Sequence, residues 1–155
     1  MIYDAVDERA TAALGVALAQ LLPPGTTVAL VGTLGAGKTR LVQAIAEACG
    51  VSRRDVVSPT FVLIQEYHGR RRVCHIDAYR VRDADEFDQL GPDEYFESDA
   101  LVLVEWADRV AGSLPRQRVE IRIEVTGDQS RRMEIAAVGP RYESLVERLR
   151  SVLAR

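Results

Sequence analysis

Apolar residues recur along the chain at two spacings, and their order is typical of an α/β protein. Residues 7–22 repeat apolar side chains every three or four positions, which predicts an amphipathic helix capped by Asp4 or Asp7. The apolar, β-branched run at 27–31 predicts a buried strand. Helical spacing returns at 41–48. The first third of the chain therefore predicts helix, strand and helix, with a glycine-rich loop between the last two.

The rest of the chain predicts hairpins on either side of a central strand. Strand-like runs at 61–67 and 73–79 flank a short connection that contains glycine, which indicates a hairpin. The continuous apolar run at 100–104 suits a strand buried on both faces. Apolar and polar residues alternate over 117–125 and again over 133–137, as in a hairpin with one solvated face. Further helices are predicted at 83–90, at 93–96 and from Pro140 onward.

The composition agrees with one globular domain over residues 1–155. The chain is 47% hydrophobic and 28% charged, as expected of a protein with a sizeable core. The order of elements predicts a three-layer α/β fold with a mixed, mainly parallel sheet and antiparallel hairpins. No apolar stretch has membrane-spanning length and the N-terminus lacks a signal-like run, so we expect a cytoplasmic protein that contacts no membrane. Cys49 and Cys74 lack metal-type spacing and are interpreted as buried thiols.

The charge balance argues against nucleic acid as the main ligand. The net charge is −3, whereas domains that bind nucleic acid are usually basic. Three consecutive arginines, Arg70–Arg72, fall in the connection of the first hairpin. We interpret them as a solvated turn rather than an RNA-binding patch, because runs of charge are usually surface. The sequence therefore gives no reason to expect DNA binding.

Residues 32–39 carry the clearest chemical signal in the chain. Their sequence, Gly-Thr-Leu-Gly-Ala-Gly-Lys-Thr, fits the phosphate-binding pattern G-x-x-x-x-G-K-[ST] and joins a predicted strand to a predicted helix. Glycine lets the backbone adopt positive φ and approach an anion closely. The N–H groups of the loop and first helical turn have no intrahelical acceptor, so they can point at the ligand. We expect the following residues to bind it: Gly32, Leu34, Gly35, Ala36, Gly37, Lys38, Thr39 and Arg40.

Two side chains of this loop supply chemistry that the backbone cannot. Lys38 adds a full positive charge for the outer phosphates, and Thr39 offers a hydroxyl to a bound Mg²⁺. Among the 20 lysines and arginines of the chain, Lys38 is the only lysine. A compact ammonium suits this position better than the planar fork of arginine. A chance glycine-rich turn is the alternative, but it would not explain why strand, loop, Lys-Thr and helix follow in the required order.

Acids at the ends of predicted strands are candidates for the rest of the site. Glu105 follows the buried run at 100–104, where phosphate-loop enzymes often hold Mg²⁺ with a carboxylate. Asp77 is a second strand-end acid, and it suits either a catalytic or a capping role. Thr60 follows a proline-stiffened loop and could sense the γ-phosphate or the metal. Trp106 could stack on a base or a partner, or simply pack.

Several of these motifs together resemble the TsaE (YjeE) family. The resemblance covers roughly residues 5–138 and rests on segments that match the family pattern in order. These segments are the loop at 32–39, Ser58-Pro59-Thr60, Asp77-Ala78-Tyr79-Arg80, Glu86 with Leu90-Gly91, and Val104-Glu105-Trp106. Three of them, Ser58-Pro59-Thr60, Asp77-Ala78-Tyr79-Arg80 and Val104-Glu105-Trp106, are much more specific than the phosphate-binding pattern alone.

The resemblance implies a fold, an activity and partners. Members of this family are small bacterial ATPases with a phosphate-loop α/β domain, required to make threonylcarbamoyladenosine in tRNA. They bind ATP and Mg²⁺, hydrolyse ATP slowly alone, and dock on the TsaD–TsaB transferase pair. ATP turnover by the assembly supports repeated rounds of modification, so this chain would serve tRNA indirectly. The acidic net charge argues mildly against direct contact with tRNA.

The resemblance also implies roles for individual residues. Lys38 and Thr39 would hold phosphate and Mg²⁺, and Glu105 the Mg²⁺. Thr60 matches the switch position, Asp77 a catalytic or metal-supporting position, and Trp106 a tryptophan beside the nucleotide. Tyr79, Arg80 and Glu86 match positions that we assign to the partner surface or to coupling. Arg131 and Arg132 are further candidates for a place near the adenosine.

Other classes of phosphate-loop protein compete with this interpretation. A GTPase would need a guanine-reading N-K-x-D element, but the chain has no asparagine and no second lysine. A small metabolite or nucleotide kinase would use the same loop with an acceptor pocket and usually an arginine-rich lid. No lid-like insertion is evident between the loop helix and Glu105. A non-enzymatic, nucleotide-dependent switch module is the third class, and the TsaE interpretation partly overlaps with it.

Overall fold

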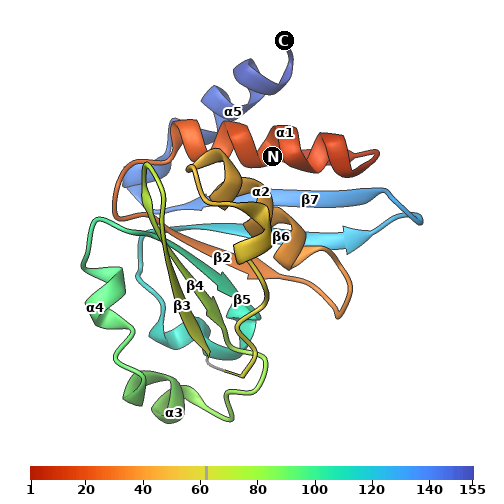
Figure 1. Ribbon diagram of the computed structural model, residues 1–155. Helices are drawn as coiled ribbons and strands as arrows, with labels where there is room; N and C mark the ends of the chain where they lie inside the picture. The colour runs from red at the N-terminus through yellow and green to blue at the C-terminus, as the bar shows by residue number, and fades with distance from the viewer. Residues whose placement is uncertain (62) are drawn as a thin grey trace.

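The computed structural model describes residues 1–61 and 63–155, and its central feature is one mixed sheet (Figure 1). The strands are β1 (Ile2–Ala5), β2 (Thr27–Val31), β3 (Ile64–His68), β4 (Arg72–Asp77), β5 (Leu101–Glu105), β6 (Arg118–Val125) and β7 (Arg131–Val138). The helices are α1 (Glu8–Leu21), α2 (Lys38–Ala48), α3 (Ala84–Gln89), α4 (Asp93–Phe96) and α5 (Leu145–Leu153). Short 3₁₀ segments are η1 (Arg53–Asp55), η2 (Ala107–Ser113) and η3 (Pro140–Tyr142).

The sheet confirms the predicted combination of parallel strands and hairpins. In the described residues the strand order is β1-β7-β6-β2-β5-β4-β3. The four central strands, β6, β2, β5 and β4, pair in parallel. The outer pairings of β1, β7 and β3 are antiparallel. Parallel pairing is thus confined to the centre of the sheet, where the loop between β2 and α2 lies.

Helices cover both faces of the central strands, as the continuous apolar runs require. One core lies between the sheet and the helices α1, α2 and α5, and it contains Leu30 of β2 and Leu103 of β5. The second core lies on the other face, where Val102 and Val104 of β5 pack with Phe87 of α3. Figure 1 shows α1 and α5 on one side of the sheet and α3 and α4 on the other. Because side chains alternate along a strand, Glu105 shares the face of Leu103 and points toward α2.

Three segments differ from the sequence prediction. The edge strand β1 was not expected, because its four residues carry no strong pattern and its partner β7 lies far away in sequence. The final helix begins at Leu145, since Pro140 starts the separate segment η3. The first strand of the predicted hairpin begins at Ile64 rather than at residue 61, and residue 62 of that prediction lies outside the described residues.

Of the two predicted caps of α1, Asp7 is the one observed, because it accepts a hydrogen bond from the Ala10 N–H at 2.8 Å.

Two arginines of the arginine-rich turn bind carbonyls at helix ends. Arg70 donates to the carbonyl of Ala48, at the C-terminal end of α2, at 2.6 Å. Arg71 donates to the carbonyl of Ala19 in the last turn of α1 at 2.7 Å. Cationic donors at these positions satisfy carbonyls that have no partner within the helix. Arg70 and Arg71 therefore join the hairpin to α2 and α1. None of the helices in the described part of the chain is long and apolar enough to cross a membrane.

The contact between α1 and α2 gives a test of the packing around the loop helix. A Cβ added to Gly15 of α1 would lie 2.5 Å from the Ala44 Cβ and 2.9 Å from the Ala44 carbonyl carbon. Alanine is the better helix former by roughly 1 kcal/mol, but overpacking costs about 1–3 kcal/mol. We expect Gly15→Ala to lower the free energy of unfolding by about 1 kcal/mol in urea denaturation. In the double variant Gly15→Ala/Ala44→Gly, the loss in free energy of unfolding should be smaller than the sum of the losses in the two single variants. A Gly15→Ala variant that is more stable than the unmodified chain would contradict this packing.

Candidate functional site

The glycine-rich loop between β2 and α2 takes its shape from two left-handed glycines. Gly35 has φ of 77° and Gly37 has φ of 108°, values that side chains with a Cβ rarely adopt. Gly32 does not have a positive φ. Gly32 is needed instead for close packing, because a Cβ there would lie 2.8 Å from the carbonyl oxygen of Ile123 in β6. The loop thus sits tightly on the sheet before it turns into α2.

The side chain of Lys38 is held inside the loop. Its Nζ donates to the carbonyls of Gly32 at 2.7 Å and Thr33 at 2.8 Å. The ammonium also lies 4.0 Å from the centroid of the Trp106 ring, which gives a cation–π contact. Lys38 is only 4% exposed, and this burial lowers the pKa of its ammonium, while the carboxylates of Glu105 and Asp77 oppose the shift. An ammonium has three N–H donors, so these two bonds leave one for an anion at the loop.

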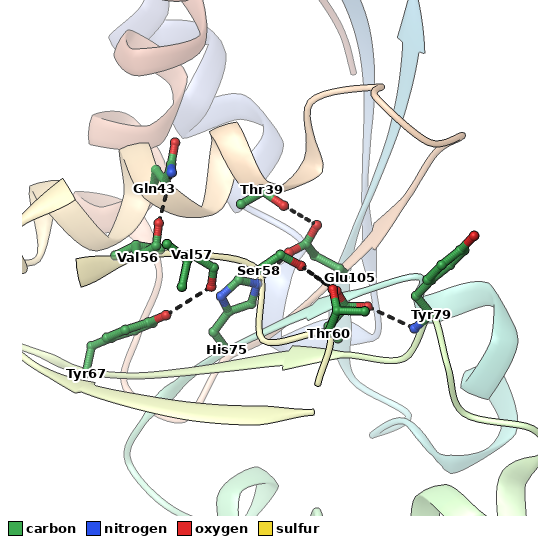
Figure 2. A network of polar contacts seen from close by, with 11 residues as sticks. Thr39, Gln43, Val56, Val57, Ser58, Thr60, Tyr67, His75, Tyr79 and Glu105 are labelled. Carbon is green, nitrogen blue, oxygen red and sulfur yellow. Dashed lines mark hydrogen bonds and ion pairs between the residues drawn. The ribbon is translucent and has the colours of Figure 1, made fainter. Parts of the chain in front are cut away.

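A chain of polar contacts leads from the loop helix into the sheet (Figure 2). The Thr39 hydroxyl donates to Oε1 of Glu105 at 2.8 Å. The other carboxylate oxygen, Oε2, lies 2.5 Å from Nε2 of His75 in β4. Glu105 is 2% exposed and His75 fully buried. Thr39 and Glu105, which are both predicted to hold Mg²⁺, therefore lie in direct contact, and His75 is a partner of Glu105 that the sequence analysis missed.

Asp77 organises the segment that carries Ser58 and Thr60. Its Oδ2 accepts hydrogen bonds from the hydroxyls of Ser58 at 2.5 Å and Thr60 at 3.0 Å. Its Oδ1 accepts the Tyr79 backbone N–H at 2.9 Å. Both carboxylate oxygens are thus engaged, which favours a positioning role for Asp77 over that of a free general base. Asp77 also pairs directly with Glu105 across β4 and β5, so the two predicted acids lie side by side.

Aromatic and cationic side chains form one wall of the site. Trp106 has φ of 57°, a left-handed conformation that costs a non-glycine residue roughly 1–3 kcal/mol. This backbone turn directs its ring onto Lys38 and onto Tyr79, whose ring centroid lies 4.8 Å away. Arg109 lies within 5.6 Å of both rings. Backbone strain at Trp106 is consistent with a functional role for its ring in this site. That the ring stacks on a base stays a prediction.

Arg40 lines two cavities that border the loop. One, of about 370 Å³, is lined by Lys38, Thr39, Ser58, Asp77, Glu105 and Trp106, among others. The other, of about 540 Å³, is lined by Gly35, Gly37, Arg40, Asp128 and Arg131, among others. Arg40 forms a salt bridge with Glu8 of α1 at 2.8 Å. Leu34, at the loop tip, is 77% exposed. The described site is therefore open to a ligand larger than a phosphate group.

Arg131 clamps the loop from the first residue of β7. Its Nε donates to the carbonyl of Ala36 at 2.7 Å, and its Nη1 to the carbonyls of Gly127 and Ser130. A contact with adenosine stays a prediction for this residue. Arg132 lies farther out and pairs with Asp4 at 2.9 Å. Of the residues assigned to a partner surface, Glu86 pairs with Arg82 at 2.8 Å, and Arg80 lies over the Phe61 ring.

The fold and the loop sequence indicate the kind of protein to which this chain belongs. The molecule is a three-layer α/β protein in which a loop with the sequence pattern G-x-x-x-x-G-K-[ST] joins a central parallel strand to a helix. The chain belongs to the TsaE family: the family model described as threonylcarbamoyl adenosine biosynthesis protein TsaE matches residues 5–133.

Relatives support this membership over most of the chain. The tRNA threonylcarbamoyladenosine biosynthesis protein TsaE of Bacillus subtilis is 42% identical over 145 residues, which cover 93% of this chain and 90% of the relative. The protein of the same name from Treponema pallidum is 36% identical, with 81% of this chain and 93% of the relative covered. The crystal structure of Bacillus subtilis YdiB superposes with a TM-score of 0.80 at 35% identity, covering 97% of this chain and 94% of that one.

Proposed function

We propose that this chain is a Mg²⁺-dependent ATPase subunit that supports transfer of a threonylcarbamoyl group to adenosine in tRNA. Its family acts in threonylcarbamoyladenosine biosynthesis. The observation that carries the ATPase proposal is the 2.8 Å contact between the Thr39 hydroxyl and the Glu105 carboxylate beside Lys38. In phosphate-loop enzymes a Ser or Thr of the loop and a strand-end acid hold the metal of a bound nucleotide.

The donor set around Thr39 fits magnesium. Among the described residues there is no group of three or more His, Cys, Asp or Glu side chains that could hold a metal ion by itself. Mg²⁺ is usually held by one or two carboxylates together with substrate phosphates, and Glu105 would supply one such carboxylate. Thr39 and Glu105 are the residues that would hold it. When bound, Mg²⁺ neutralises the charge on the phosphate oxygens.

The other residues of the site would bind and orient the triphosphate. The N–H groups of the loop and the N-terminus of α2 favour an anion at Gly35–Thr39. Lys38 adds charge from within the loop, where low exposure strengthens its attraction for phosphate. Asp77 holds Ser58 and Thr60 at the edge of the same cavity. These hydroxyls would orient the attacking water or sense the outer phosphate, which is the role predicted for Thr60.

We further propose that the chain acts in the cytoplasm by docking on a TsaD–TsaB transferase pair, and that it serves tRNA without binding it directly. Exposed apolar side chains at the rim of the cavity support the proposal of a protein partner: Leu34 is 77% exposed and Tyr79 is 37% exposed. Phe61, on the segment after Thr60, is 85% exposed. Exposed apolar groups beside a site are typical of protein contacts. The net charge of −3 gives no general attraction for tRNA.

Product analysis with γ-labelled ATP tests this function against the kinase alternative. We expect free phosphate and ADP without any added acceptor, slowly for the chain alone and faster with TsaD and TsaB. Repeated modification of tRNA by the reconstituted assembly should require this chain and ATP together. Stoichiometric transfer of label to a small molecule would instead indicate a kinase. Full multiple-turnover modification without this chain would contradict the proposed role in the assembly.

A further inference from the structure

His75 is a buried residue whose side chain contacts Glu105, the proposed metal-holding acid. It is fully buried in β4, and its Nε2 lies 2.5 Å from Oε2 of Glu105. In the part of the chain that the structure describes, its other ring nitrogen, Nδ1, is buried without a hydrogen-bond partner. An unsatisfied buried nitrogen costs stability. The fold therefore retains this imidazole despite a cost that an apolar side chain would avoid.

The chemistry of the pair fixes the direction of the hydrogen bond. An ionised carboxylate only accepts hydrogen bonds, and a metal-holding Glu105 must be ionised. Nε2 of His75 therefore carries the hydrogen and donates it to Oε2. The Thr39 hydroxyl occupies the other oxygen, Oε1. The carboxyl group is thus held at both ends, from α2 on one side and from β4 on the other (Figure 2).

The sheet holds His75 in the correct place for this contact. β4 and β5 are parallel neighbours, with His75 opposite Leu103 and Asp77 opposite Glu105. Side chains two residues apart on one strand share a face, so His75 lies on the same face as Asp77 and Glu105. The Tyr67 ring of β3, with its centroid 6.3 Å away, limits the space for other positions of the imidazole. The backbone and the packing therefore both fix the imidazole.

We infer that His75 is a positioning residue, which holds Oε2 of Glu105 so that Oε1 is presented to Thr39 and to the nucleotide-bound cation. The inference rests on the proposed function of the site. His75 does not touch the ligand itself but acts through Glu105. Partners that orient the side chains around a metal typically change metal affinity by about 10–100-fold when they are replaced. A merely structural histidine would change stability but leave the metal-dependent part of nucleotide binding intact.

Calorimetric titration of the full chain with ATP, once with Mg²⁺ and once with EDTA, tests this inference. The measured quantity is the metal-dependent gain, which is the ratio of the two dissociation constants. We expect His75→Leu to lower this gain by about 10–100-fold while ATP affinity in EDTA stays within about twofold. Cys74→Ala is the matched control, because Cys74 is the neighbouring residue of β4 and packs in the core on the opposite face of the sheet. It should keep the full gain.

A second pair of variants keeps the test decisive if His75→Leu does not fold. Glutamine can place an amide N–H near the position of Nε2, whereas asparagine reaches only the position of Nδ1. We expect His75→Gln to restore most of the gain and His75→Asn to lose it. Equal gains in these two variants, or a full gain in a folded His75→Leu, would overturn the positioning role. No gain in the unmodified chain would instead count against the proposed function itself, so the two failures can be told apart.

Discussion

Replacing Lys38 by alanine is expected to have the largest effect on ATP binding and turnover. The ammonium is fixed by the carbonyls of Gly32 and Thr33 and by the Trp106 ring, so it is oriented before a ligand arrives. Removing one fixed donor to a developing negative charge costs roughly 10²–10³-fold in rate. We expect Lys38→Ala to lower ATP turnover by at least about 100-fold. The measurement is release of labelled phosphate by the chain with TsaD and TsaB.

Lys38→Arg separates the loss of charge from the loss of shape. Arginine keeps the charge, but its planar fork cannot make the same contacts with two loop carbonyls and an aromatic face in this space. We expect it to bind ATP better than Lys38→Ala but to turn over far more slowly than the unmodified chain. Circular dichroism and thermal unfolding provide the control for folding. Unchanged ATP turnover in a folded Lys38→Ala variant would show that the loop lysine takes no part in ATP hydrolysis.

The second large effect is expected from Glu105→Gln, which removes the charge of the acid and keeps its size. A glutamine side chain can still accept from His75 and donate to the Thr39 hydroxyl, so both buried partners stay satisfied. The amide is a poor ligand for Mg²⁺, which prefers carboxylates. We therefore expect a folded protein that binds ATP in EDTA but gains little from Mg²⁺. Turnover should fall by about 100-fold or more.

Glu94→Gln is the matched control, because it makes the same change at an exposed position on α4. It should leave nucleotide binding and turnover unchanged. A Glu105→Gln variant with normal turnover and a normal Mg²⁺ response would show that another group holds the cation. Loss of folding in Glu105→Gln would contradict the claim that its buried contacts survive the change.

The sequence predicts much of the site because its residues stand at the ends of recognisable elements. The loop motif lies between a strand and a helix with clear patterns, so the positions of Lys38 and Thr39 follow from local signals. Glu105 follows an apolar run and Asp77 follows a shorter strand-like one, which identifies them as strand-end acids. That they lie directly opposite one another depends on the register of β4 against β5, which no local pattern specifies.

The features that sequence reasoning missed depend on contacts between distant segments. β1 is a strand only because it pairs with β7, more than a hundred residues later. His75 lies two positions before Asp77 on the same strand, so the two side chains share a face, but only the structure shows the contact of His75 with Glu105. The turn of Trp106 onto Lys38 needs a left-handed backbone at a residue without special propensity for it. Such features follow from tertiary packing rather than from local preference.

Direct titration of the unmodified chain with ATP and Mg²⁺ in a calorimeter tests the central claim, which is that the loop and Glu105 together hold a magnesium–nucleotide complex. We predict saturable binding at one site per chain, weaker when EDTA replaces Mg²⁺ and lost when Lys38 is alanine. Absence of saturable binding in a correctly folded sample, or affinity that does not respond to Mg²⁺, would contradict the account.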